Sequence, residues 1–148
     1  MISHSLFNNV GMEAISIASV LNIKSELQIS KAVLIPPIVA HAALLNHLAR
    51  ASTKVLSFEK YLIEHLPDFS NFNDRYYDSL ATAINAIQLL NELELVEISG
   101  PLMKKVRAID FDKSMGKRAE KVFKAAPNIS ELLSDSSEKL YLNLRIEL

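Results

Sequence analysis

Residues 82–109 read TAINAIQLLNELELVEISGPLMKKVRAI, and this stretch decides the fold class. From Thr82 to Leu93, apolar residues recur every three or four positions, which predicts an amphipathic helix. The period then changes, because Leu95 to Ile98 is largely apolar, Ser99-Gly100-Pro101 is typical of a turn, and Leu102 to Ile109 can return as a strand. A helix followed directly by a short β-hairpin predicts a winged-helix-like domain, in which the hairpin is the wing.

The residues before this stretch predict helices joined by short loops. A leading loop, Leu6-Phe7-Asn8-Asn9, offers an asparagine N-cap to an apolar helix from Met12 to Asn22. Ser30 is expected to cap a second helix. Pro36 and Pro37 should break or kink that helix, because proline lacks the N–H donor, and the helix can restart at Pro37 and continue to about Ala49.

The middle and the end of the chain follow the same pattern. A helix from Phe58 to Leu66 is expected to start after Ser57 and stop at Pro67. An aromatic loop, Asp68 to Phe72, precedes a helix over Asn73 to Leu80. After the hairpin, three segments are expected: a helix from Lys113 or Ser114 to Ala126 ending before Pro127, a short helix capped by Ser130 and running to Leu133, and an apolar tail from Leu140 to Ile146.

The fold class is therefore mainly α, a winged-helix-like domain with one short β-hairpin. At 148 residues the default is a single domain over residues 1–148. It comprises a helical N-terminal segment (residues 1–66), the helix pair and wing (residues 71–110), and a basic helix and tail (residues 111–148). The residues expected in the core are Ile15, Ala18, Leu34, Ile38, Leu45, Leu62, Ile84, Ile87, Leu90, Leu93, Val122 and Phe123.

Composition narrows the classes of function. The chain has no cysteine, which excludes thiolate zinc sites and cysteine catalysis and fits a reducing, cytoplasmic location. No basic, apolar leader is visible at the start. The longest apolar run, Ala32 to Ala40, is shorter than the roughly 20 residues of a membrane span, so no membrane partner is expected.

No constellation of catalytic residues is visible. With only three glycines the chain holds no phosphate-binding loop, and no cofactor is expected. His41 and His47 are six residues apart, on different faces of a helix, so a metal site is not predicted. Asp74 and Asp78 are one helical turn apart and are interpreted as a solvated polar face rather than an acid–base pair. We therefore expect no enzyme.

Two groups of residues are candidates for binding. Apolar and aromatic side chains near the start, the middle and the end of the chain are candidates for a protein interface, with core packing as the alternative for the aromatic ones: Leu6, Phe7, Phe69, Phe72, Tyr76, Tyr77, Leu142 and Ile146. Residues 101–127 carry eight basic and three acidic side chains in a chain of net charge −1. Their basic members could contact nucleic acid or an acidic partner, or form a solvated helix face: Lys104, Lys105, Arg107, Lys113, Lys117, Arg118, Lys121 and Lys124.

Several local patterns together resemble one family. They are Leu6 to Asn9 followed by the apolar helix through Leu21, Ser30 to Pro36 with His41 shortly after, the helix and hairpin over Ala83 to Pro101, and the basic helix Lys117 to Ala126. Glu131-Leu132-Leu133 and the ending Asn143 to Ile146 complete the set. The chain resembles the middle component of three-component ABC-type systems of prokaryotes, which include the Lamassu anti-phage systems. The family's usual ending carries a glycine and a proline near Leu144 and Glu147, where this chain departs from it.

This resemblance implies a non-enzymatic adaptor. Such a subunit would link an SMC- or Rad50-like ABC ATPase to an effector, often a nuclease, in a cytoplasmic anti-phage defence complex, and would reach DNA through that complex. The alternative is a stand-alone winged-helix DNA-binding regulator that reads DNA with Thr82 to Leu93. That helix has no lysine or arginine, which counts against the alternative.

Overall fold

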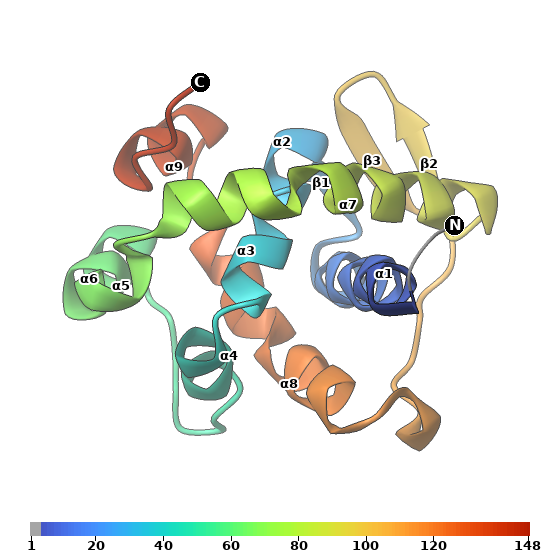
Figure 1. The fold of residues 1–148 in the computed structure, drawn as a ribbon, viewed down its shortest axis with the longest axis horizontal. Helices are drawn as coiled ribbons and strands as arrows, with labels where there is room; N and C mark the ends of the chain where they lie inside the picture. The colour runs from blue at the N-terminus through green and yellow to red at the C-terminus, as the bar shows by residue number, and fades with distance from the viewer. Residues whose placement is uncertain (1–3) are drawn as a thin grey trace.

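The computed structural model describes residues 4–148, with side chains from Asn9 onward, as a mainly helical fold with a small antiparallel sheet. Figure 1 shows helix α7 (Phe72–Glu92) running across the molecule, with helix α9 (Ser137–Asn143) near its first turns and the hairpin near its last. Helix α1 (His4–Lys24) lies beneath the second half of α7 and also packs against helix α8 (Lys117–Leu132).

The sheet completes a winged-helix topology. Strand β1 (Glu26–Gln28) follows α1, and strands β2 (Val96–Ser99) and β3 (Leu102–Lys105) form the predicted hairpin. The strand order is β1-β3-β2, all antiparallel, so β3 is paired on both sides. Gly100 begins the tight connection of the hairpin with φ of +57°, a backbone conformation that glycine adopts without steric cost. The mainly helical fold with a short hairpin is thus confirmed.

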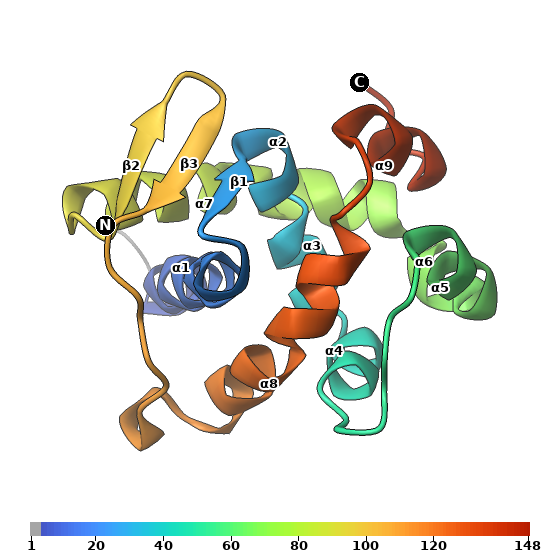
Figure 2. The same ribbon diagram turned by 180° about the vertical axis from the view of Figure 1, so that it is seen from behind.

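The other helices are short, and three of them are inserted between the second and third helices of the winged helix. Helices α2 (Ile29–Ala32) and α3 (Ile35–Val39) together occupy the second position, and α7 is the third. Between them lie α4 (Ala42–Leu48), α5 (Phe58–Glu64) and α6 (Leu66–Phe69), and a single 3₁₀ turn, η1 (Lys113–Met115), precedes α8. Seen from behind in Figure 2, this insertion and α9 lie at the opposite end from the hairpin.

The start of the chain differs from the sequence-based prediction. The prediction of a leading loop at Leu6 to Asn9 is wrong, because α1 already begins at His4. Gln28, rather than Ser30, precedes α2, and the Ser30 hydroxyl instead contacts the Ser137 hydroxyl 2.7 Å away.

The chain breaks and restarts around Pro36 and Pro37 as predicted, whereas Pro127 does not end its helix. Helix α2 ends at Ala32, and α3 restarts at Ile35 with both prolines in its first turn, where a missing N–H costs nothing. A second break, at His41, separates α3 from α4. Pro127 lies inside α8, which continues to Leu132 and buries Ser130 instead of using it as a cap.

In the middle of the chain, the two helices predicted over 73–80 and 82–93 are one helix, α7. The predicted aromatic loop before it, Asp68 to Phe72, is the end of α6 and the start of α7. By contrast, Ser57 caps α5 as predicted, since its hydroxyl accepts the Lys60 N–H at 3.2 Å.

One cluster of buried side chains runs from Ala14 to Ile146. It contains seven of the twelve expected core residues: Ala18, Leu34, Ile38, Leu45, Ile87, Leu90 and Val122. Ile15, Leu62 and Phe123 are half-buried. Ile84 and Leu93 are 45% and 52% exposed, so their assignment to the core is wrong. Ile84 lies on α7 beyond the stripe that faces α1 and α3, and Leu93 directly follows the helix; periodicity alone does not locate that stripe.

Among the described residues no single helix is long and apolar enough to cross a membrane; the segments Ile29–Val39 and Ala42–Leu48 have the length and composition only as a pair bent by 105°.

Candidate protein interface

The outward side of α7 is the first candidate interface. In a winged-helix DNA reader the third helix enters the major groove and presents donors to the base edges. Here the exposed side chains of α7 are acidic, amide or apolar: Asp74, Tyr77, Asp78, Ala81, Ile84, Asn85, Gln88, Asn91 and Glu92. The single basic residue of α7, Arg75, is turned inward and donates to the carbonyls of Pro37 and Asp68. This surface lacks the cations that contact phosphates and is suited to a protein partner.

An apolar groove lies beside this surface. It has a volume of about 560 Å³ and is open to solvent. Its walls come from α2, α7 and α9: Ile29, Val33, Tyr76, Leu80, Ile84, Ser137, Glu138, Tyr141 and Leu148 are among its lining residues. Ile84 on α7 lies at the border between this groove and the outward face of the helix, which makes it the natural residue with which to test both.

Hydrogen bonds fix the wall that α9 provides. The Tyr141 hydroxyl donates to the carbonyl of Ser30 at 2.7 Å and lies 3.3 Å from the Tyr76 hydroxyl. The Ser137 hydroxyl bridges α9 to Gln28 and Ser30. Burial and the neighbouring Tyr76 hydroxyl raise the pKa of Tyr141 far above its ordinary value, so this contact stays neutral. The groove is therefore a preformed feature of the fold.

The predicted aromatic interface is only partly on the surface. Phe69, Phe72, Tyr76 and Ile146 are buried, so their assignment to an interface is wrong, and they form the core contacts weighed as the alternative. Phe72 is fully buried, with its ring 5.9 Å from that of Phe69. These four side chains therefore contribute mainly to the core, and Tyr76 in addition lines the apolar groove between α7 and α9.

Two other members of the predicted interface lie on the surface. Tyr77 and Leu142 are 45% and 77% exposed and remain available to a partner. The hydroxyl of Tyr77 donates to the carbonyl of Glu147, so α7 holds the end of the described chain. The side chains of Leu6 and Phe7 lie outside the described residues.

The basic residues do not form one patch. Lys104, Lys105 and Arg107 belong to the wing and the loop after it, whereas Lys113, Lys117, Arg118, Lys121 and Lys124 lie on η1 and α8. Figures 1 and 2 place the wing and the start of α8 at different edges of the molecule, with α1 between them. Consecutive basic residues in the sequence are thus separated into two groups in space.

Acidic residues flank one member of the wing group, Lys104. Lys104 is paired across the sheet with Glu26 on one side and with Glu97 on the other. Opposite charges on directly facing residues attract one another. The guanidinium of Arg107 donates to the carbonyl of Leu93, at the end of α7. Glu26 and Glu97 thus reduce the positive potential around Lys104, whereas Lys105 has Val96 as its cross-strand neighbour.

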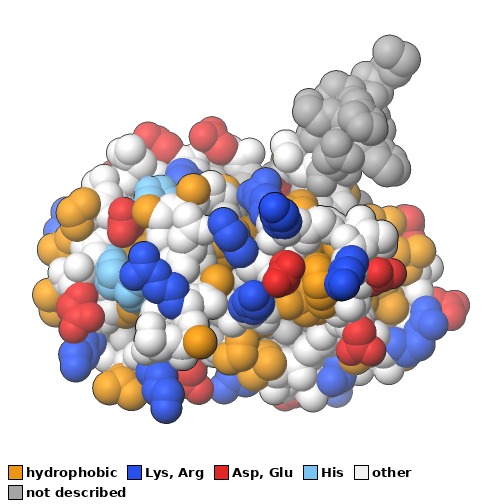
Figure 3. Space-filling model, turned by 90° about the horizontal axis from the view of Figure 1, so that it is seen from below, with side chains coloured by type: hydrophobic (Ala, Val, Ile, Leu, Met, Phe, Trp, Pro, Cys, Tyr) orange, Lys and Arg blue, Asp and Glu red, His pale blue; other side chains and the backbone are white. Residues whose placement is uncertain are grey.

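The α8 group is more exposed. Lys117, Lys121 and Lys124 follow one another at helical spacing on the solvent side, and Lys124 pairs with Glu120 at 3.0 Å. Figure 3, which views the molecule from the side of α8 and α4, shows the lysine and arginine side chains interspersed with acidic and apolar ones. This face is the better of the two for contact with nucleic acid or an acidic surface.

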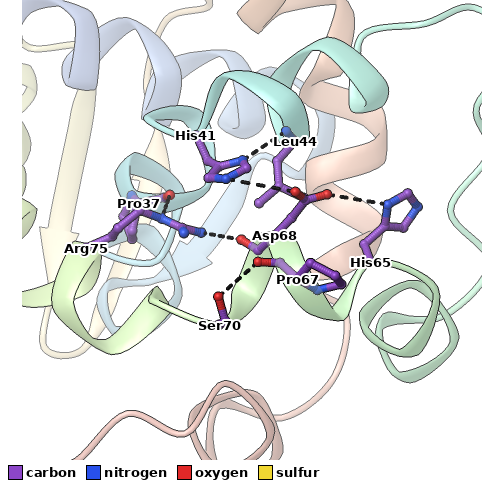
Figure 4. A network of polar contacts seen from close by, with 8 residues as sticks. All are labelled: Pro37, His41, Leu44, His65, Pro67, Asp68, Ser70 and Arg75. Atoms are coloured by element: carbon purple, nitrogen blue, oxygen red, sulfur yellow. Dashed lines mark hydrogen bonds and ion pairs between the residues drawn. The ribbon is translucent and has the colours of Figure 1, made fainter.

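The inserted helices bring together histidines that are far apart in the sequence. Figure 4 shows Asp68 of α6 between His41 and His65, with carboxylate-to-ring distances of 3.9 and 3.7 Å. His41 also caps α4, since its Nδ1 accepts the Leu44 N–H at 3.2 Å. The His47 ring lies 4.5 Å from that of His65. Three of the four histidines thus gather where α4, α5 and α6 meet.

The contacts within this cluster, which cap α4 and join it to α6, indicate a structural role. Among the described residues no group of three or more histidine, aspartate or glutamate side chains is placed to hold a metal ion. Burial lowers the pKa of His47 below its ordinary value, and the neighbouring His65 adds to this effect. Burial raises the pKa of Tyr61, whose hydroxyl lies 3.0 Å from His47, to about 12. The spacing of these residues in the sequence does not predict the cluster, because its members come from different helices and from the turns between them.

Comparisons with known proteins add no relative to this description. No protein family model, curated protein or solved structure matches the chain.

Proposed function

We propose that this protein is a non-enzymatic accessory subunit that links an SMC- or Rad50-like ABC ATPase to an effector nuclease in a prokaryotic, cytoplasmic anti-phage complex. Two lines of reasoning support the proposal. The local sequence patterns from Leu6 to Ile146 resemble the middle component of three-component ABC-type systems. The fold adds a winged helix whose third helix is suited to protein contact.

The observation that carries the proposal is the outward face of α7. It combines the exposed apolar side chains of Tyr77 and Ile84 with the carboxylates of Asp74, Asp78 and Glu92. An apolar centre with a charged rim is the usual composition of a specific protein interface. A partner segment of apolar residues flanked by lysine or arginine would complement this face, because both its charge and its apolar surface would be matched.

The proposal is tested by co-expressing the chain with the products of the genes that flank its own, which the proposal requires to include an ABC ATPase and a nuclease. We expect a complex that survives size-exclusion chromatography. Ile84→Arg should weaken binding to one partner at least tenfold, because it places a charge in the apolar centre of the face. Ile63→Arg is the matched control, since Ile63 lies on α5 and is 70% exposed. A chain that remains monomeric with both partners, or that tolerates Ile84→Arg, would rule the proposal out.

The alternative, a stand-alone DNA-binding regulator, is favoured by the winged-helix topology and by the exposed lysines of α8. If this alternative is right, the isolated chain binds a specific DNA duplex, and its affinity falls steeply as the salt concentration rises. A mobility-shift titration between about 50 and 200 mM salt, with and without the ATPase, separates the two functions. Binding that requires the ATPase supports the accessory role.

A further inference from the structure

Helix α8 divides its residues sharply between a buried side and a charged side. Its buried residues are small or aliphatic, and Ser130 is the single polar one among them. Four of its six exposed residues are cations; the six are Lys117, Arg118, Lys121, Lys124, Pro127 and Glu131. In a chain of net charge −1, the exposed side of α8 is therefore a local concentration of positive charge.

A loop that is distant in the sequence adds two more cations to this surface. The loop between α4 and α5 carries Arg50 and Lys54, which are both exposed, and has no acidic side chain. The amide of Asn128, on α8, is hydrogen-bonded to the backbone of Thr53 and Val55, the two neighbours of Lys54. Lys54 is thus held close to α8, although more than 60 residues separate it from the start of that helix.

Acidic side chains neutralise only part of this surface. Glu120 pairs with Lys124 at 3.0 Å, which leaves less charge on that lysine. Lys117 and Lys121, by contrast, form no ion pair among the described residues. They lie one helical turn apart on the same side of α8, so their charges add to one potential. Lys117 and Lys121 are therefore the cations best placed to receive an anionic partner.

The placement of the cations does not serve the stability of α8. Lys117 and Arg118 lie in its first turn, where the helix dipole favours negative charge over positive charge. Among the described residues no side chain caps this end of the helix. The charge of Arg118 acts on the carboxylate of Glu13, whereas Lys117 has no such compensation. A local rule that is broken in this way without a structural gain indicates a role in binding.

The chemistry of the exposed side favours the backbone of a nucleic-acid duplex over other anionic partners. A specific protein interface has an apolar centre, but over residues 117–132 no apolar side chain other than Pro127 is exposed. Single-stranded nucleic acid is bound by stacking of its bases on aromatic side chains, and α8 exposes none over the same residues. Clustered cations alone are sufficient for the densely charged backbone of a duplex.

We propose that α8 and the loop between α4 and α5 bind the phosphate backbone of duplex DNA without reading its sequence. Lys117 and Lys121 lie at the centre of this surface, with Lys124 and Lys54 beside them. The segment from Lys117 to Lys124 spans about 10 Å of helix axis, a length over which a DNA duplex carries roughly six charges.

This DNA surface is separate from the protein interface on the outward face of α7. Helix α1 packs against both α7 and α8 and lies between them in Figure 1. The chain can therefore hold a protein partner and DNA at the same time. The DNA contact does not rest on the proposed function, and it differs from the recognition of a specific duplex by α7 that a stand-alone regulator requires.

Fluorescence anisotropy of a labelled short DNA duplex, titrated with the purified full chain, is the test. Contacts that are independent of sequence are weak, with Kd values of about 10⁻⁴–10⁻⁶ M, so binding is measured in solution. Two duplexes of unrelated sequence should bind with equal affinity. If about three phosphates are neutralised, the affinity should fall roughly 40-fold between about 50 and 200 mM salt.

Poly-glutamate distinguishes DNA from an acidic protein as the partner. It should displace the duplex only at a charge concentration well above that of the DNA. Displacement at equal charge concentration would assign the surface to an acidic protein and overturn the proposal. A preference for one duplex sequence, or no binding at the lowest salt concentration, would overturn it as well.

Variants locate the DNA surface. The double variant Lys117→Glu, Lys121→Glu should reduce DNA affinity at least tenfold, and it should make the slope of log affinity against log salt shallower by about 2. It should fold normally, because it places negative charge near the N-terminus of α8, which circular dichroism verifies. The matched control is Arg107→Glu, Lys139→Glu, which makes the same change of net charge at exposed positions after the wing and on α9. Equal losses of affinity in the two double variants would mean that net charge alone governs binding and would refute the assignment to α8.

Discussion

At the scale of single residues, a few polar side chains connect segments that are far apart in the sequence. Asn128 is the clearest of them. Its amide nitrogen donates to the carbonyls of Leu48 and Thr53, at 2.9 and 3.0 Å, and its oxygen accepts the Val55 N–H at 3.1 Å. One side chain thus satisfies three backbone groups at the end of α4 and in the loop that follows it, a loop with no regular structure of its own.

Asn128→Ala should lower the free energy of unfolding by about 2–3 kcal/mol, because it removes three hydrogen bonds and leaves partly buried backbone groups unpaired. Urea denaturation followed by circular dichroism measures the change. Asn85→Ala, which truncates an exposed asparagine on α7, should change stability by less than about 0.5 kcal/mol. If Asn128→Ala destabilises the protein no more than Asn85→Ala does, water replaces the three hydrogen bonds without cost.

At the scale of elements, α8 shows how tertiary packing overrides a local rule. Pro127 cannot donate to the carbonyl of Phe123, one turn earlier, yet the helix continues to Leu132. Ala125, Ala126, Ile129 and Leu132 on either side of the proline are buried against the rest of the core. Burial of this apolar stripe offsets the lost hydrogen bond, so the sequence rule that ends a helix before proline fails here.

Pro127→Ala should therefore stabilise the protein, by about 1–2 kcal/mol, because it restores a helical N–H at an exposed position. The gain is less than the full difference in helix propensity, since alanine also gives more freedom to the unfolded chain. Thermal unfolding by calorimetry measures it, with Glu131→Ala as a control in the same helix. A destabilised Pro127→Ala variant would show that the second half of α8 packs correctly only when the helix is bent at the proline.

The same elements show what could be predicted from the sequence. Regular apolar spacing was enough for the part of α1 from Met12 to Asn22 and for the second half of α7, and the change of period with Gly100 was enough for the hairpin. Strand β1 has three residues and a single buried side chain, Leu27, so no periodicity could reveal it. The contacts of Asp68 with His41 and of Glu13 with Thr82 could not be predicted, because they join residues from different segments of the chain.

At the scale of the whole molecule, stability depends on pH through groups whose pKa values change on folding. Burial lowers the pKa of His47 in the folded protein. As the pH falls, the unfolded chain then binds a proton first, near the ordinary value of about 6.5. His47 thus contributes stability that is present above this value and is lost as the pH falls through it. The raised pKa of Glu13 acts with the opposite sign, since it favours the folded state at low pH.

The free energy of unfolding should accordingly decrease between about pH 7.5 and pH 5.5, and His47→Gln should make this decrease smaller. Denaturant titrations at several pH values measure both curves, and their difference isolates the contribution of His47. A variant whose curve runs parallel to that of the unmodified chain would contradict the assignment.

The insertion of α4, α5 and α6 has a consequence for how the chain folds. In an uninterrupted winged helix, the second and third helices are joined by a turn of about four residues, so they meet almost as soon as they form. Here residues 40–71 separate α3 from α7. Closing a loop about eight times longer adds roughly 2 kcal/mol of chain entropy. We therefore expect the pairing of α3 with α7 to be a slower, longer-range event than in an uninterrupted winged helix.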